Sequence, residues 1–264
     1  MEIKLGTIYI VGIGPGELRM MTVQAIDTIM KCGVVVGYKT YVDLLSKHFP
    51  EKQFISTPMR MEIERCLTCF ELALMGFPVA IICSGDAGVY GMASPMFSLR
   101  NEYPEYAGIE LCVVPGITAA NSGASVLGAP LSHDYCVISL SDLLIPWEVI
   151  EKRLVAAVQG DFAVAIYNPS SHKREDYLRR ACEVMIKAGA SKERACGLVE
   201  NIGRSGTRRE VCTLGELMEK KVNMFTTVFI GNSKSEIIER KKTGPDGKSE
   251  KTEKYLVTSR GYKI

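Results

Sequence analysis

The sequence has no apolar run long enough to cross a bilayer, which takes about 20 residues in a helix. Residues 1–5 also lack the hydrophobic region of a signal peptide. We therefore expect no membrane partner and a cytoplasmic location. The nine cysteines are an odd number, and without a secretory signal we expect them to be reduced, buried residues and not a disulfide framework.

A basic body suited to nucleic acid is also missing. The formal net charge of +2 combines +4 in residues 234–264 with −2 in the residues before them. Because the basic excess lies in the C-terminal segment, we expect no nucleic-acid partner. What is present is a chain of 264 residues with 47% hydrophobic composition, long enough for two compact domains with separate cores.

Short apolar strands alternate with helical patterns, as in βα units on a mostly parallel sheet. The first half predicts strands at residues 7–11, 34–36, 79–82 and 109–114. The pattern restarts near residue 134, with strands at 135–140, 162–167, 195–199 and 226–230, an extended stretch at 210–213, and helices at 147–158 and 174–187.

These patterns predict a domain at residues 1–114, a second at 115–233, and a polar, basic tail at 234–264 that ends in a strand or loop. Within the tail, residues 241–254 predict a hairpin or loop, with the turn sequence Gly-Pro-Asp-Gly at 244–247.

The glycine-rich segment at residues 84–91, Ser-Gly-Asp-Ala-Gly-Val-Tyr-Gly, directly follows an apolar strand. Glycine allows a ligand to approach the backbone closely, and open parallel sheets bind ligands at the carboxyl ends of their strands. Asp86 either accepts hydrogen bonds from a ligand's hydroxyl or amino groups, or accepts them from the amides of its own loop.

Two further loops follow strands in the first half. Gly-Ile-Gly-Pro-Gly at residues 12–16 is not a dinucleotide fingerprint, because position 17 is Glu and Pro15 lacks an amide donor. The segment is either a ligand loop or a tight turn. Residues 114–125 predict a strand end, a turn and a helix of small residues with Thr118 as its N-cap. Either another helix or a flat ligand lies close against such a helix.

In the second half, Asn168, residues 200–203 and residues 231–232 follow predicted strands. Each is also compatible with an ordinary loop, but together they favour a ligand in a cleft between the two halves. Cys66 and Cys69 have C-x-x-C spacing but lie in a helical pattern without a histidine or a second pair nearby. We interpret them as core residues and predict no metal site.

The segments at residues 12–16, 85–86, 114–120 and 200–201 resemble, in order and spacing, the tetrapyrrole methylase family, and the resemblance extends to about Asn232. Residues 37–41, 84–93, 138–144 and 167–169 are similar to the branch that methylates C17 of precorrin-3B or cobalt-precorrin-3 in cobalamin biosynthesis. Residues 258–262 resemble the ending of the anaerobic version, which acts on the cobalt-containing macrocycle.

The resemblance implies two α/β domains, with a mostly parallel sheet in the first and a mixed sheet in the second. It implies a homodimer that holds S-adenosylmethionine between the domains, transfers its methyl to C17, releases S-adenosylhomocysteine and contracts the ring. Asn168 stands where relatives often have Met, and Ile202 where many have Gly or Ala. The implied cofactor contacts are Pro15, Ser84, Gly85, Asp86, Val89, Thr118, Ala119, Asn168 and Ile202.

The sulfonium methyl is already activated, so the protein mainly has to align the reactants and exclude water. Ring contraction also requires proton movement, for which Asp142 and His133 are the acid–base candidates. The candidates for binding the macrocycle's carboxylates are Lys39, Arg60, Arg204 and Arg208.

Three alternatives stay open. The first is another methylase of this family, acting at a different ring position or on a protein side chain as diphthine synthase does. The second is a non-catalytic module that binds a nucleoside-like or tetrapyrrole ligand. The third, a nicotinamide-dependent oxidoreductase, is disfavoured by the missing fingerprint.

Overall fold

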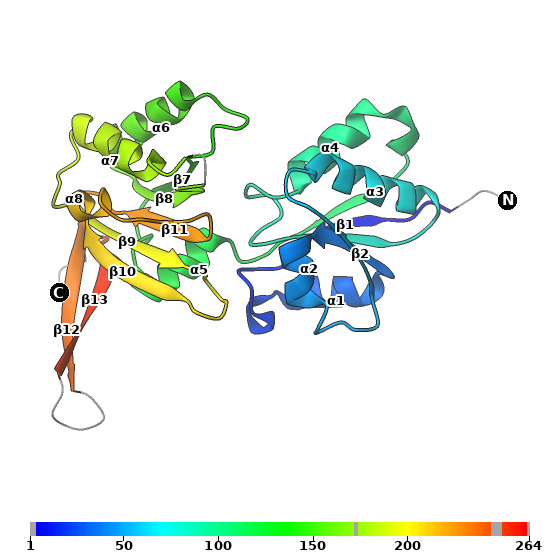
Figure 1. The fold of residues 1–264 in the computed structure, drawn as a ribbon, viewed down its shortest axis with the longest axis horizontal. Helices are drawn as coiled ribbons and strands as arrows, with labels where there is room; N and C mark the ends of the chain where they lie inside the picture. The colour runs from blue at the N-terminus through cyan, green and yellow to red at the C-terminus, as the bar shows by residue number, and fades with distance from the viewer. Residues whose placement is uncertain (1–3, 172–173, 244–249, 263–264) are drawn as a thin grey trace. The chain divides into compact units, whose positions relative to one another are not determined.

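The first half of the chain folds into a five-stranded sheet in which every neighbouring pair is parallel, in the order β3-β2-β4-β1-β5. Val35 and Ala80 pack with residues of α1 and α2, whereas Val36 and Ile81 pack with residues of α3 and α4. Helices therefore bury both faces of the sheet (Figure 1), as is usual for parallel sheets. The elements are β1 (Ile8–Gly12), α1 (Val23–Lys31), β2 (Val34–Tyr38), α2 (Lys39–Leu45), β3 (Gln53–Thr57), α3 (Glu62–Leu74), β4 (Val79–Cys83), α4 (Ala93–Glu102) and β5 (Leu111–Val114), with short 3₁₀ turns at Leu18–Met20 and Pro104–Tyr106.

The second half contains a mixed sheet in the order β10-β9-β11-β8-β7, in which β7 and β8 are parallel and the remaining neighbours are antiparallel. Helices α6, α7 and α8 cover one face of this sheet around Ile166 and Val228. The two α/β units with a parallel and a mixed sheet confirm the predicted fold class. The elements are α5 (Ala119–Leu127), β6 (Gly128–Ala129), β7 (Tyr135–Ser139), α6 (Trp147–Gln159), β8 (Ala163–Tyr167), α7 (Tyr177–Lys187), β9 (Ala195–Glu200), β10 (Arg208–Thr213), α8 (Leu214–Leu217), β11 (Thr226–Ile230), β12 (Ser235–Thr243) and β13 (Glu250–Thr258).

The helix of small residues, α5, packs against the second sheet. A Cβ atom added at Gly123 would lie 2.8 Å from Cζ of Phe229, and one added at Gly197 would lie 2.8 Å from Cδ1 of Leu127. Small residues here thus let the helix approach the strands of a sheet closely, whereas another helix or a flat ligand was expected from the sequence.

This computed structural model describes residues 4–171, 174–243 and 250–262. It divides into units Met1–Ala119 and Ala120–Ile264, a few residues beyond the division expected at 114/115. The predicted turn at residues 244–247 lies outside the described residues. No helix within the described residues is long and apolar enough to span a membrane.

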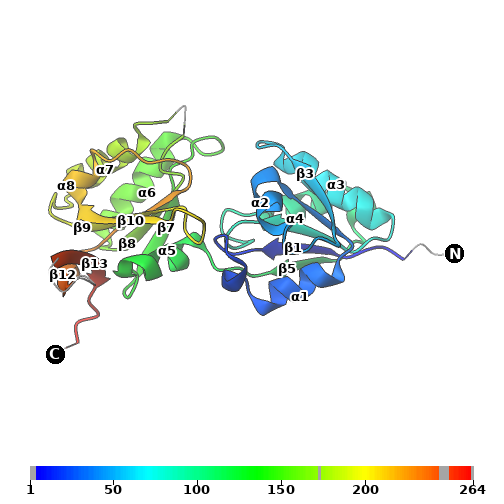
Figure 2. The ribbon, with the colours of Figure 1, turned by 60° about the horizontal axis from the view of Figure 1, so that its bottom comes forward.

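The predicted C-terminal tail is part of the second unit. Strands β12 and β13 form an antiparallel hairpin (Figures 1 and 2). Strand β13 also pairs in parallel with β6. Leu256 is fully buried, and the hydroxyl of Thr258 donates a hydrogen bond of 2.6 Å to the carbonyl of Pro130. The sequence did not predict these contacts, because the segment is mostly charged and only a few of its apolar residues face inward.

Candidate functional site

Three loops meet at the carboxyl edge of the first sheet, where the parallel strands β1, β4 and β5 end. The Gly14 N–H donates to the Gly85 carbonyl at 3.0 Å, and the Gly85 N–H donates to the Gly14 carbonyl at 2.7 Å. Both residues have a φ of +71°, a conformation that glycine adopts without a steric penalty. This reciprocal pair joins the loops that follow β1 and β4.

The loop after β5 packs backbone to backbone against the other two. A Cβ atom at Gly116 would lie 2.1 Å from the Gly85 carbonyl oxygen and 2.6 Å from the carbonyl carbon of Gly12. A side chain at this position would separate the three loops. The absence of side chains at these glycines therefore allows the three loops to pack together into one continuous backbone surface.

Asp86 connects this surface through its carboxylate. One oxygen accepts a hydrogen bond of 2.8 Å from the Gly88 N–H, and the other accepts one of 2.9 Å from the Gly116 N–H. Of the two roles considered for Asp86, the loop-amide role is the one observed. Each oxygen retains a further lone pair, so the half-buried carboxylate can still accept a hydrogen bond from a ligand.

Most of the predicted cofactor residues lie in these loops. The Ser84 hydroxyl is 3.4 Å from the Gly14 carbonyl, and Thr118 directly precedes α5, in the position predicted for a cap. Gly85 is buried, whereas Ser84, Asp86, Val89 and Thr118 are half-buried. The residues gathered at this edge are Pro15, Ser84, Gly85, Asp86, Val89, Thr118 and Ala119.

Asn168 and Ile202 share an edge of the second sheet, because β8 and β9 are both antiparallel to β11 and so run in the same direction. Asn168 is exposed, has a φ of +52°, and donates from Nδ2 to the Ser139 hydroxyl at 2.9 Å. Ile202 is buried, and its Cδ1 lies 3.0 Å from a Cβ added at Gly123. The side chain of Ile202 therefore packs inside the second unit, and a cofactor contact at this residue stays a prediction.

Residues 231–232 were grouped with these loops from the sequence, and the structure corrects that grouping. They follow β11, which runs antiparallel to β8 and β9, so they lie at the opposite edge of the sheet. Strand direction within a mixed sheet is not readable from the hydrophobic pattern.

The two acid–base candidates are not brought together. His133 precedes β7 and Asp142 follows it, so a five-residue strand rising about 3.3 Å per residue separates them. His133 is exposed, and its Nδ1 accepts a hydrogen bond of 2.9 Å from the Asp134 N–H. The structure therefore places the two candidates apart, and a role for each of them in proton movement stays a prediction.

Asp142 belongs to a polar cluster that includes two residues the sequence analysis missed. Its carboxylate accepts a hydrogen bond of 2.6 Å from the Tyr177 hydroxyl and one of 3.3 Å from Nη1 of Arg174. These partners, the Tyr177 hydroxyl first, hold the pKa of Asp142 below its ordinary value, so it is an anion at neutral pH. Such a group is in the form that can accept a proton, but its lowered pKa makes it a weak base, and it has no proton to donate as a general acid. Helix 174–187 was expected to include Arg174, but α7 begins at Tyr177, so Arg174 lies in the preceding loop.

The four cations proposed for substrate carboxylates lie at the same two edges. Lys39, after β2, forms an ion pair of 3.0 Å with Asp43, and Arg60, after β3, is exposed with a φ of +69°. In the second unit, Arg204 follows β9 and its guanidinium lies 5.4 Å from the ring centre of Phe225. Arg208 begins β10 opposite Glu200.

No group of His, Cys, Asp and Glu among the described residues is arranged to hold a metal ion. Cys66 and Cys69 are fully buried in α3, as predicted for core residues. Burial raises the pKa of the Cys66 thiol to about 12.

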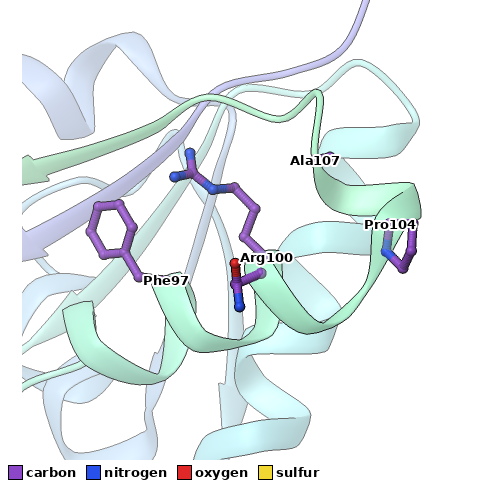
Figure 3. Close-up of a pocket in the computed structure, with 5 residues that line it drawn as sticks. Phe97, Arg100, Pro104 and Ala107 are labelled. Atoms are coloured by element: carbon purple, nitrogen blue, oxygen red, sulfur yellow. The ribbon is translucent and has the colours of Figure 1, made fainter.

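A surface pocket in the first unit lies away from the loops. Phe97, Arg100, Asn101, Pro104 and Ala107 line it, on α4 and the turn that follows (Figure 3). The chain must return along α4 from the end of β4 to the start of β5, so the last turns of α4 lie at the opposite edge of the sheet. This pocket is not part of the candidate site.

Comparison with known proteins identifies the family of this chain. The model of the tetrapyrrole (corrin/porphyrin) methylases matches residues 7–218. The chain belongs to the tetrapyrrole methylase family. A probable cobalt-factor III C(17)-methyltransferase of Salmonella typhimurium is 44% identical over 255 residues, which cover 97% of this chain and 99% of the relative. A precorrin-3B C(17)-methyltransferase of Sinorhizobium sp. is 36% identical over 89% of this chain and 92% of its own length.

Solved structures of the family share the fold. The crystal structure of the methyltransferase CobJ has a TM-score of 0.83 and 32% identity, covering 96% of this chain and 100% of that one. A uroporphyrin-III C-methyltransferase from Thermus thermophilus, solved with S-adenosyl homocysteine, has a TM-score of 0.66 at 18% identity. As a tetrapyrrole methylase, the chain is expected to use S-adenosylmethionine.

The donors and acceptors of the first unit fit such a cofactor. S-adenosylmethionine presents ribose hydroxyls and an ammonium group that need acceptors, and Asp86 has a lone pair left on each oxygen. The glycine loops around it bring backbone groups close to any ligand at this edge. When bound, the cofactor supplies an activated methyl group.

Proposed function

We propose that this tetrapyrrole methylase transfers a methyl group from S-adenosylmethionine to C17 of a precorrin-3-type macrocycle, with contraction of the ring. The observation that carries the proposal is the three-loop surface closed by Asp86, in a chain 44% identical over almost its full length to a probable cobalt-factor III C(17)-methyltransferase. We propose the cobalt-containing macrocycle, cobalt-factor III, as the substrate.

The protein's own residues mainly bind and orient. Asp86 and the backbone of residues 84–89 hold the cofactor, and Pro15, Thr118 and Ala119 complete its contacts in the first unit. The family resemblance adds Asn168 and the main chain of Ile202 to the proposed cofactor contacts. No side chain has to act as a nucleophile, because alignment of the reacting carbon with the methyl group supplies most of the rate enhancement. Asp142, held as an anion, is the proposed proton acceptor during ring contraction.

A turnover experiment tests this function. The purified protein is incubated with cobalt-factor III and methyl-labelled S-adenosylmethionine, and the product is analysed by mass spectrometry and NMR. The expected product carries one additional methyl group, located at C17. Methylation at another position would favour a different branch of the family. Tight binding of both ligands without turnover would favour a binding module.

We also propose a homodimer that works in the cytoplasm. The nine cysteines are all free, seven of them buried, which is compatible with a reducing compartment. The dimer rests on the family resemblance, and light scattering coupled to size-exclusion chromatography tests it: a mass of one chain would contradict the proposal.

A further inference from the structure

Arg174 is held in a fixed geometry at the carboxyl ends of β7 and β8. Its Nε donates to the Ser171 hydroxyl at 3.0 Å, and its Nη1 donates to the Ser141 hydroxyl at 2.8 Å and to Asp142 Oδ1 at 3.3 Å. The Tyr177 hydroxyl holds the other oxygen of Asp142 at 2.6 Å. Two loops and the first turn of α7 thus fix the plane of one guanidinium.

These bonds leave part of the guanidinium available. Arginine has five N–H donors, of which Nε uses one and Nη1 uses two. Nη2 of Arg174 makes no hydrogen bond to any of the described residues. Every buried side-chain nitrogen and oxygen among those residues does have a partner. Nη2 is therefore accessible to a ligand, although only 15% of the side chain is exposed.

The surroundings favour an anion that is also apolar. The Arg180 guanidinium lies 4.2 Å from the ring centre of Trp147 and 4.9 Å from that of Tyr177. The Arg174 guanidinium lies 6.0 Å from the same Tyr177 ring centre, so two cations adjoin this ring. Leu143 and Leu144 follow Asp142 directly and are 63% and 95% exposed, so apolar surface adjoins the cation. A ring system with peripheral carboxylates has this combination of properties.

We propose that Arg174 binds a peripheral carboxylate of the macrocycle through Nη2, and that Asp142 and Tyr177 position it. This inference rests on the proposed function for the identity of the ligand. It adds a fifth cation to the four chosen from the sequence, and Arg174 differs from exposed Lys39 and Arg60 in being pre-oriented. Pre-orientation lowers the entropic cost of binding.

Steady-state kinetics with cobalt-factor III test the proposal in Arg174→Gln and Arg174→Lys. For Arg174→Gln we expect the KM for the macrocycle to rise at least about tenfold, as for the loss of a hydrogen bond to a charged group. The KM for S-adenosylmethionine should not change. Arg174→Lys keeps the positive charge but lacks the planar guanidinium, so its KM for the macrocycle should rise less. The matched control is Arg179→Gln, since exposed Arg179 pairs with Glu219 at 2.7 Å and should tolerate the change.

A change on the ligand side keeps the test independent of how well a variant folds. Equilibrium binding of cobalt-factor III and its methyl ester is measured by absorbance, with S-adenosylhomocysteine present. Esterification masks all the carboxylates, so it should weaken binding to the wild type by more than the factor lost in Arg174→Gln, and should weaken binding to that variant less than binding to the wild type. Equal losses in both proteins, or a fall in kcat at unchanged KM and Kd, would overturn the carboxylate role.

Failure of the proposed function gives a different result. A wild type that binds the macrocycle with this dependence on Arg174 but forms no methylated product would refute the methyltransferase proposal and support the binding site. A wild type that methylates the macrocycle while Arg174→Gln keeps wild-type KM and Kd would refute the site alone. Absence of both binding and turnover would overturn the two together.

Discussion

Two aspartates, one in each unit, hold loops together with both oxygens of their carboxylates. Asp86 accepts from the amides of Gly88 and Gly116, and Asp142 accepts from the side chains of Arg174 and Tyr177. In both cases an ionised group connects its own loop to a segment at least 30 residues away in the sequence, and hydrogen bonds to charged groups are stronger than neutral ones. The two residues differ in what they fix: Asp86 fixes backbone, and Asp142 fixes a cation.

Replacing Asp86 by Ala should affect stability and cofactor binding together. The change leaves the Gly88 and Gly116 amides without their partners, so we expect the free energy of unfolding to fall by about 1–3 kcal/mol. The Kd for S-adenosylmethionine, measured by calorimetry on the folded variant, should rise. Exposed Asp27 on α1 is the control, and Asp27→Ala should change stability by less than about 0.5 kcal/mol. Unchanged stability in Asp86→Ala would contradict the structural role of the carboxylate.

Asp142 should make stability depend on acid pH. Its folded-state pKa is lowered, chiefly by the Tyr177 hydroxyl, so its contribution is complete above the unfolded pKa near 4 and is lost as the pH falls through the folded pKa. Asp142→Asn should therefore be less stable than wild type by about 1–3 kcal/mol at neutral pH. This difference should shrink below about pH 4, as urea unfolding at a series of pH values would show. The pKa values of three other carboxyl groups are also lowered, those of Asp161, Glu216 and Glu253. These groups are present in both proteins, so their contributions cancel when the two stabilities are compared.

At the scale of elements, the sequence was informative where a strand contains an apolar run. The apolar runs of β1, β4, β8 and β11 predicted their positions, and the loops after β1 and β4 were identified as candidate binding loops. The strand β3 was missed because only two of its five residues, Phe54 and Ile55, are apolar. The contact between Gly12, Gly85 and Gly116 could not be predicted, since it depends on the tertiary arrangement of three strands that are distant in the sequence.

The start of α7 shows the same limit. Its apolar stripe predicted the helix, but the loop that places Arg174 against Asp142 has no periodicity of its own. A run of Asn, Pro and two Ser residues after β8 was the only available signal that a loop continued there.

The contact between the glycine loops predicts a large effect of one methyl group. In Gly116→Ala, the new Cβ would lie 2.1 Å from the Gly85 carbonyl oxygen, and backbone on both sides leaves little room to relax. We expect the free energy of unfolding to fall by about 2 kcal/mol or more. Gly33→Ala is the matched control, because a Cβ at exposed Gly33 would meet nothing within 4 Å. Chemical denaturation of both variants gives the comparison, and equal stability would mean that the loops are not in contact.

At the scale of the whole molecule, the two units have separate cores. The cores around α3 and α7 each include cysteines in place of larger residues, and the fully buried Cys69 and Cys196 lie one in each unit. A buried thiol behaves as a small apolar residue, and desolvation disfavours its reactive thiolate form. Thiol reactivity therefore reports on opening of either unit.

Titration with an aromatic disulfide reagent at mildly alkaline pH should show this protection. Of the nine thiols, seven are buried, and burial raises the pKa of Cys32 to about 11 and of Cys212 to about 12. We expect at most the two half-buried thiols, Cys112 and Cys136, to react within minutes in the native protein, and all nine to react in concentrated guanidinium chloride. The buried thiols of the native protein should react more slowly, at rates set by opening of their own unit. A destabilising change in the first unit, such as Gly116→Ala, should therefore accelerate the reaction of Cys69 more than that of Cys196. Rapid reaction of more than two thiols in the native wild type would show that these cores are more open than the packing indicates.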